Sequence, residues 1–287
     1  MQVKDKAVSK NNRMTAIVYV VLRVLVIAIL IRAIILGRWD QVFYCALALI
    51  EFMVPSFVEK RLRIELPSAL EIIVLLFIFA GEILGEIGEF FNKIQVWDLI
   101  LHTTNGFLMA AIGVALIDVF NKSPKINFSM SPFFVAFVAF CFSMTIGVLW
   151  EFTEYSCDRY LGFDMQKDTI VSSVNSYELN PGGSSPLKIT GITETEIKGK
   201  VNGKPADMTI NGYLDIGLND TMEDMFVNLI GAVVFSIIAA FYIKGRGKSR
   251  GGVAEALIPR MLTQEEYSEK NAEWLTKKER LKSRFKI

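Results

Sequence analysis

The sequence predicts an all-α polytopic membrane protein with six transmembrane helices, cytoplasmic N- and C-termini, and a small β-containing extracytoplasmic insertion between helices 5 and 6. Three observations predict this class. The 287 residues are 52% hydrophobic and have a mean hydropathy of +0.38, which exceeds the usual apolar content of soluble domains. Apolar runs long enough to cross a bilayer recur along the chain. Lys and Arg gather near both ends, as they do in cytoplasmic flanks.

The first predicted span covers residues 15–36 and follows a polar N-terminal segment, residues 1–14. Basic side chains such as Lys10 and Arg13 precede the span, which predicts that the N-terminus lies in the cytoplasm. The apolar run has no small-residue cleavage site and is as long as a membrane span. We therefore expect a retained helix and not a removed signal peptide.

The remaining spans alternate in direction across the membrane. The basic turn at residues 59–63 and the lysines at 122 and 125 fall between spans, where this alternation requires cytoplasmic loops. Spans two to five cover residues 41–58, 66–90, 97–120 and 132–157. Residues 15–158 thus hold helices 1–5, and residues 219–243 form helix 6.

Residues 159–218 interrupt the apolar pattern and are expected to form the extracytoplasmic cap. Ile, Thr and Val alternate over residues 188–201, and the turn signal Asn202-Gly203 follows, which predicts a β-hairpin. Two interpretations stay open for this cap, namely a tolerated loop insertion and a lid over a membrane site.

The C-terminal tail, residues 244–287, is strongly basic and is predicted to be cytoplasmic. Thr263 followed by Glu266 matches a capping box, which predicts the start of an amphipathic helix. This helix either rests on the anionic inner membrane surface or is solvated.

Acidic residues recur at the predicted outer ends of spans three to six, together with the single histidine of the chain. Asp98 and His102 are four residues apart, so they share a face of span four. At the helical rise of about 1.5 Å per residue, one side chain from each of these spans reaches a similar depth. These four side chains are Glu86, His102, Glu154 and Asp224.

The residue types in this layer suit a mixed nitrogen and oxygen site for a divalent cation such as Zn, Mn, Mg or Fe. The cost of an Asp at the bilayer centre is about 2.5–3.5 kcal/mol, so such groups need partners, protons or water. Carboxylates that share protons and a purely structural hydrogen-bonded cluster both stay open as alternatives. The expected metal ligands are Asp98, His102, Glu154, Asp224, Glu86, Asp220 and Asn228, with Glu151 as the candidate general base.

Composition and motifs exclude several other classes of site. A single histidine cannot build a two-histidine lipid phosphatase or a multi-histidine desaturase, and the chain has neither a GxSxG motif nor a P-loop. The three cysteines form no CxxC pair, which argues against a disulfide framework and a structural zinc site. The charge pattern requires no nucleic-acid partner.

Three motifs carry a family resemblance: Trp97-Asp98 with His102 and Gly106, Trp150-Glu151 with Glu154, and Asp220-Thr221 with Asp224, Asn228 and Gly231. With these motifs the chain resembles the YjdF-like family of uncharacterised bacterial inner-membrane proteins. It is more loosely similar to VanZ-like proteins. The resemblance implies a multi-pass protein of the bacterial plasma membrane with a role at the cell envelope.

Three function classes remain open at this point. The first is a metal-dependent enzyme that acts on a lipid or a lipid-linked envelope substrate at the outer leaflet. The second is a transporter coupled to protons or cations. The third is a non-catalytic envelope or assembly factor whose polar cluster fixes helix packing. Membrane lipids are the expected partners in all three.

Overall fold

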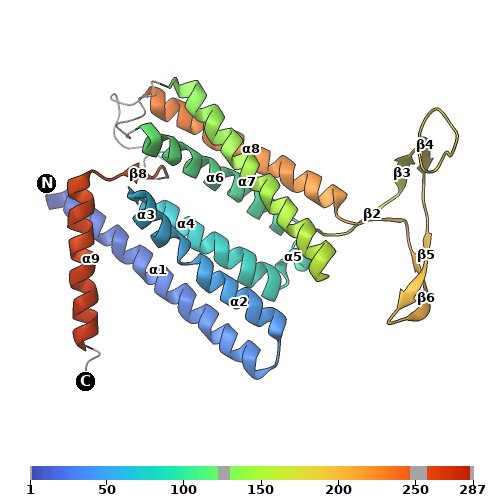
Figure 1. Cartoon of the computed structure of the whole chain (residues 1–287), viewed down its shortest axis with the longest axis horizontal. Helices are drawn as coiled ribbons and strands as arrows, with labels where there is room; N and C mark the ends of the chain where they lie inside the picture. The colour runs from blue at the N-terminus through green and yellow to red at the C-terminus, as the bar shows by residue number, and fades with distance from the viewer. Residues whose placement is uncertain (1, 122–129, 246–256, 285–287) are drawn as a thin grey trace. The chain divides into compact units, whose positions relative to one another are not determined.

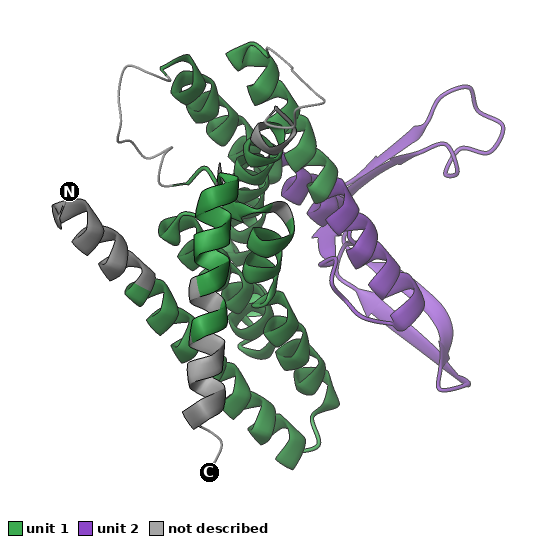
Figure 2. Ribbon diagram, turned by 60° about the vertical axis from the view of Figure 1, so that its left-hand side comes forward, with its two compact units in different colours: residues 1–147, 227–287 green, residues 148–226 purple. Residues whose placement is uncertain are grey.

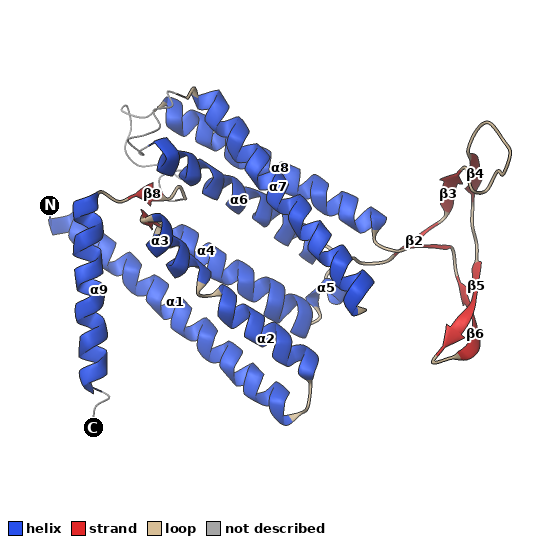
Figure 3. Ribbon diagram, viewed as in Figure 1, coloured by secondary structure: helices blue, strands red, loops and turns tan. Residues whose placement is uncertain are grey.

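The computed structural model describes residues 2–121, 130–245 and 257–284 (Figure 1). The chain divides into two compact units, residues 1–147 with 227–287 and residues 148–226 (Figure 2). Within the described part of the chain, six helices are long and apolar enough to cross a membrane. A small β-containing segment lies between the fifth and sixth of them (Figure 3). Both features confirm the predicted six-helix membrane fold with a β insertion, and the cytoplasmic side of the termini stays a prediction.

The helices follow the predicted order of spans. The N-terminal ones are α1 (Gln2–Ile35), α2 (Trp39–Glu51), α3 (Val54–Leu62), α4 (Ser68–Ile78), the π-helix η1 (Phe79–Ile87), the short α5 (Phe90–Lys93) and α6 (Trp97–Asn121). The later ones are α7 (Pro132–Ser156), the π-helix η2 (Cys157–Leu161), α8 (Leu218–Lys244) and α9 (Gln264–Arg284).

Two of the predicted spans are not single regular helices. The second is broken between α2 and α3, because Pro55 in the first turn of α3 lacks a backbone N–H and starts a new helix. The third continues from α4 into η1, whose wider turns leave the α-helical hydrogen-bond pattern. The indole of Trp97 donates a hydrogen bond to the Ala80 carbonyl in η1 at 3.3 Å, which ties this segment to the start of α6.

The first unit contains two hydrophobic cores. One joins α1, α2, α4 and η1 through side chains such as Val26, Phe52 and Leu75. The other joins α4, α6, α7 and α8 through side chains such as Leu108 and Phe235. Phe235 also packs edge to face against Phe107 of α6, with ring centroids 4.9 Å apart.

Glycines allow α6, α7 and α8 to approach one another closely. A Cβ atom at Gly106 would overlap the Asn228 carbonyl oxygen, and one at Gly231 would overlap the Thr103 carbonyl oxygen. A Cβ atom at Gly147 of α7 would lie 2.7 Å from Asn228 Nδ2. Small residues at contacts of this kind are typical of packed membrane helices. We call this three-helix contact the glycine junction.

The second unit holds the β segment. Its strands pair antiparallel in three two-stranded ribbons: β2 (Thr169–Val171) with β7 (Tyr213–Asp215), β3 (Ser173–Ser176) with β4 (Leu187–Thr190), and β5 (Thr195–Val201) with β6 (Lys204–Ile210). The predicted hairpin turn is confirmed, because Asn202 and Gly203 both have positive φ, at 51° and 79°. The predicted first strand was too long, since residues 187–190 pair with β3 instead.

The tail forms the capping box predicted for it. Glu266 N–H donates to Thr263 Oγ1 at 3.2 Å, and Thr263 N–H donates to Glu266 Oε2 at 2.8 Å. Just before α9, the short strand β8 (Arg260–Met261) pairs with β1 (Ile64–Glu65). Residues 122 and 125, two of the predicted loop lysines, lie outside the described residues.

The glycine junction predicts a clear difference between glycines. Gly106→Ala and Gly231→Ala should each lower the free energy of unfolding by about 1–3 kcal/mol, because the added methyl group meets backbone of the facing helix. The midpoint of thermal unfolding in detergent measures this loss. Gly81→Ala is the matched control, since a Cβ there has no neighbour within 4 Å. Equal melting of all three variants would contradict close packing at the junction.

Candidate metal centre

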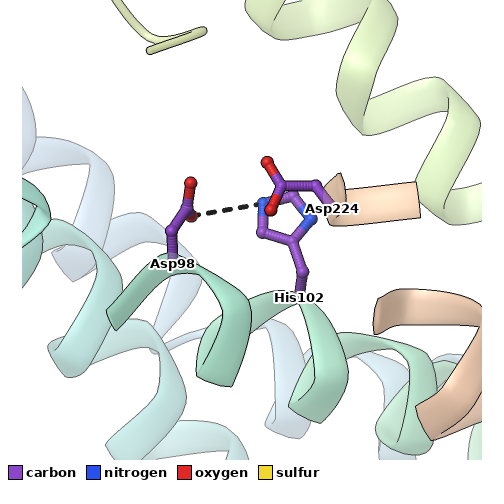
Figure 4. Close-up of side chains that lie close together, drawn as sticks. All are labelled: Asp98, His102 and Asp224. Carbon is purple, nitrogen blue, oxygen red and sulfur yellow. Dashed lines mark ion pairs between the residues drawn. The ribbon is translucent and has the colours of Figure 1, made fainter. Parts of the chain in front are cut away.

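Asp98 and His102 lie in the first two turns of α6 and face each other. Asp98 Oδ1 is 3.4 Å from His102 Nε2 (Figure 4, dashed line). The histidine is buried, with 6% of its surface exposed, while Asp98 is partly exposed. A carboxylate beside one ring nitrogen fixes the orientation of the imidazole and selects its tautomer. The spacing that suggested this pair in the sequence therefore yields a contact.

The Asn228 side chain links all three helices of the glycine junction. Its Oδ1 accepts a hydrogen bond from Asn105 Nδ2 of α6 at 3.2 Å, and its Nδ2 points to Met144 Sδ of α7 at 3.6 Å. Beside it, Ser143 Oγ donates to the Gly106 carbonyl oxygen at 2.7 Å. Asn228 and Ser143 are almost fully buried. These bonds fix the rotation of α6, α7 and α8 about their own axes.

Each of these three helices carries an ionisable side chain one turn from the junction. Gly106 and Gly147 both lie against Asn228. A side chain four residues away lies on the same face of its own helix, about 6 Å further along the axis. Those side chains are His102 before Gly106, Glu151 after Gly147 and Asp224 before Asn228.

The acidic side chains involved are among the few buried polar groups of the described residues. Glu151 is 4% exposed, Glu154 is 7% exposed and Asp224 is 1% exposed. Burial of a carboxylate at this level requires a proton, a hydrogen-bonding partner or a cation. Two groups of side chains could hold a metal ion, Asp98 with His102 and Asp224, and His102 with Glu151 and Glu154.

Trp150 orients one of these carboxylates. Its indole Nε1–H donates to Glu154 Oε1 at 2.8 Å across one turn of α7. Charge-assisted bonds of this length are among the stronger hydrogen bonds in proteins. The indole bonds to Oε1 and not to Oε2 of Glu154.

Two further aspartates, near the ends of α7 and α8 in the second unit, bind a loop. The Asp158 carboxylate accepts the backbone N–H groups of Met165 and Gln166 at 2.6 and 2.8 Å. Asp220 Oδ2 accepts the N–H of Lys167 at 2.7 Å. These bonds hold residues 162–168 against both helix ends, and we call this arrangement the aspartate collar. The collar supports the helix turns that carry Glu154 and Asp224.

The collar carries excess negative charge. Burial raises the pKa of Asp168, and the neighbouring Asp164, Asp158 and Asp215 raise it further. Because the folded-state pKa is raised, the charged form of Asp168 is less favourable in the folded than in the unfolded protein. Its contribution to stability is therefore present below about pH 4 and is lost as the pH rises through the raised pKa.

The other predicted ligands, Glu86, Asp220 and Asn228, lie elsewhere or have other partners. Among the described residues, the groups that could hold a metal leave out Glu86 and Asp220. Glu86 lies on η1 near Glu82, and Asp220 serves the collar. The Asn228 amide is engaged with Asn105, so it supports the helices. Sequence reasoning missed Gly147 and Ser143, although Gly147 precedes Glu151 by the same four-residue step that relates Asp98 to His102.

Comparisons with known proteins identify a family but no activity. A family model described as "Predicted membrane protein (DUF2238)" matches residues 17–245. An uncharacterised protein of Thermotoga maritima is 26% identical over 107 residues, which is 37% of this chain and 53% of that protein. The chain thus matches about half the length of this relative. No solved structure matches. These findings agree with the resemblance to YjdF-like membrane proteins.

The aspartate collar predicts local stability at the helix ends. Asp158→Ala leaves two backbone N–H groups without their carboxylate, at a cost of about 1.5–3 kcal/mol for each charge-assisted bond. Amide exchange of residues 163–168 should accelerate, as measured by mass spectrometry. Asp207→Ala on β6 is the control and should leave that segment unchanged. Unaltered exchange in Asp158→Ala would show that the collar does not hold the segment.

Proposed function

We propose that this chain, which belongs to the DUF2238 family of predicted membrane proteins, binds a divalent cation through His102, Asp98, Glu154 and Asp224. The proposal extends to a metal-dependent enzyme of the bacterial plasma membrane that acts on a lipid or lipid-linked envelope substrate. Its main support is that His102 is buried and that its ring lies within 4.8 Å of oxygens of three buried carboxylates, those of Glu151, Glu154 and Asp224.

Charge balance supports a cation. Glu151, Glu154 and Asp224 are buried, and the only histidine of the chain offers a ring nitrogen within 4.8 Å of an oxygen of each. A neutral imidazole supplies a nitrogen ligand, and carboxylates supply oxygen ligands, which is a donor set for Zn, Mn or Fe. A bound divalent ion would offset the negative charge that burial otherwise makes costly.

The order of groups along each helix supports separate roles. Asp98 orients His102, and Trp150 orients Glu154, so two proposed ligands already have a positioning partner. Asn228, one helical turn after Asp224, contacts Asn105 of α6 and Met144 of α7. Glu151, which lies in one group with His102 and Glu154, is assigned the role of general base. A base in this place would take a proton from water or from a substrate hydroxyl.

When bound, the metal would polarise a phosphoryl or carbonyl oxygen and lower the pKa of bound water. The substrate class follows from the location of the site. The proposed ligands lie within about two turns of the ends of the candidate membrane spans, where we expect lipid headgroups to meet the hydrocarbon. A reacting group carried on a lipid reaches this depth without leaving the membrane. We propose the outer leaflet, because the charge rule predicts that these helix ends face away from the cytoplasm.

Metal content tests the ligand set. The detergent-purified protein should carry about one divalent ion per chain, and His102→Ala and Asp224→Asn should each lose it, because outright loss of a ligand weakens binding more than the 10- to 100-fold typical of an outer partner. Inductively coupled plasma mass spectrometry provides the measurement.

Glu51→Gln is the matched control for this experiment. Glu51 is another acidic residue within a span, on α2, and belongs to neither group that could hold a metal. It should retain the wild-type metal content. A stoichiometric ion that persists in both His102→Ala and Asp224→Asn would place the metal elsewhere.

The catalytic role is tested by turnover of a polyprenyl diphosphate in proteoliposomes. Phosphate release should require the metal and should fall as the pH is lowered from about 8 to about 5, because ligation needs a neutral imidazole and ionised carboxylates. Glu151→Gln should reduce the rate by about 10²- to 10⁴-fold, the usual contribution of a general base, while it keeps the metal. A metal-loaded wild type without turnover of lipid-linked phosphates would refute this substrate class and leave the metal site standing.

A further inference from the structure

A segment near the C-terminus packs back into the first unit. Leu257 and Ile258 are 7% and 5% exposed, and Pro259 is fully buried. Leu257 and Ile258 belong to the same hydrophobic core as Leu70 of α4 and Leu108 of α6. The chain thus returns after α8 and inserts three consecutive apolar residues between helices that precede it by more than a hundred positions.

Backbone bonds fix the register of this return. Strand β8 pairs antiparallel with β1, with Ile64 opposite Met261 and Glu65 opposite Arg260. The Leu262 N–H donates to the Arg63 carbonyl oxygen at 3.0 Å. The paired region is only two residues long, so the backbone ladder alone is a weak attachment.

Arg63 makes two contacts with the start of α9. Its Nη1 donates to Gln264 Oε1 at 3.1 Å, and its guanidinium lies 5.2 Å from the centre of the Tyr267 ring. Arg63 itself has a φ of 54°, in the left-handed region that a residue with a side chain seldom adopts. The contacts with Gln264 and Tyr267 help to stabilise this backbone conformation.

An ion pair closes the contact on its outer side. Lys270 Nζ lies 2.7 Å from Glu65 Oε1, and the two side chains are 47% and 28% exposed. The pair joins the second turn of α9 to the turn between α3 and α4. Solvent reaches it, so its strength should depend on ionic strength.

The packing beneath this contact is incomplete. An apolar cavity of about 70 Å³ adjoins Pro259 and is lined by side chains of α3, β1, α4 and α6, including Ile64, Leu70 and Ile112. Atoms that border a void lose dispersion contacts, so the three buried residues are held less firmly than a filled core would hold them. A glycine-rich sequence at positions 245–252 precedes them.

We propose that residues 257–270 act as a releasable strap across this end of the helix bundle, with the Lys270–Glu65 ion pair as its latch. In the closed state, Pro259 covers the apolar cavity and the strap ties the α3–α4 turn to the core around α6 and α8. Release withdraws residues 257–259 and opens the cavity. The strap thereby couples the charge environment around α9 to the packing of α3, α4 and α6.

Maleimide labelling of the full-length protein in detergent tests the strap. Ile258→Cys, in a background with Cys141→Ala and Cys157→Ala, should react slowly because position 258 is buried, while Thr263→Cys should react fast because it is exposed. Lys270→Glu should speed the labelling of Ile258→Cys by about three- to tenfold, since it turns an attraction into a repulsion. Higher salt should also speed the labelling of Ile258→Cys when Lys270 and Glu65 are both present.

The swap variant Glu65→Lys with Lys270→Glu is the control, since it restores opposite charges and should restore slow labelling. Size-exclusion chromatography of each variant separates release of the strap from unfolding. Fast labelling of Ile258→Cys with the latch intact would overturn the closed state. Slow labelling that Lys270→Glu and salt leave unchanged would show a permanent core segment and overturn the releasable strap.

Discussion

The arrangement of the proposed site depends on the contacts that the Asn228 side chain makes with α6 and α7. Its carboxamide bonds to Asn105 of α6 and approaches Met144 of α7 where glycines bring three backbones together. A polar group buried at this depth costs free energy unless it is paired, so the junction tolerates few alternative registers. The rotations of α6, α7 and α8 that satisfy Asn228 also set the directions of His102 and Asp224.

The membrane adds a second constraint, because apolar surroundings penalise charge more than water does. Around α7 and α8 the acidic residues lie near the helix ends and have two roles. Asp158 and Asp220 accept backbone N–H groups at the surface end of α7 and α8. Glu151, Glu154 and Asp224 lie deeper and are buried. A cation is the partner that we propose for Glu154 and Asp224 of this deeper set. Trp150 positions Glu154, and Asp98 is both a proposed ligand and the carboxylate beside His102.

Much of the fold could be predicted because hydropathy and basic residues are strong local signals in membrane proteins. All six spans were found, and the Asn202-Gly203 hairpin and the Thr263 capping box carried recognisable turn and cap chemistry. The break before α3 and the π-helical end of the third span were not predicted. The break follows from Pro55, a local signal that the prediction of the spans did not use, and at the π-helical end of the third span the Ala80 carbonyl bonds to Trp97 of α6.

The site was predictable in part for a similar reason. Helical spacing related Asp98 to His102 within one span, but no spacing rule reports that Asn228 bonds across to Asn105 or that Asp220 caps a loop. Asn105 lies 123 positions from Asn228, and Lys167 lies 53 positions from Asp220, so both contacts depend on the tertiary fold. Helical spacing therefore names candidate ionisable residues, but it does not separate ligands from supporting residues.

The central claim is that His102 of α6 and Asp224 of α8 bind one cation. Electron spin-echo spectroscopy of the protein loaded with Mn²⁺ measures this most directly, because a bound imidazole gives a nitrogen coupling. The account predicts one such coupling, which disappears in His102→Gln, and loss of the bound ion in Asp224→Asn. Bound manganese without nitrogen coupling, or a coupling that survives in His102→Gln, would contradict it.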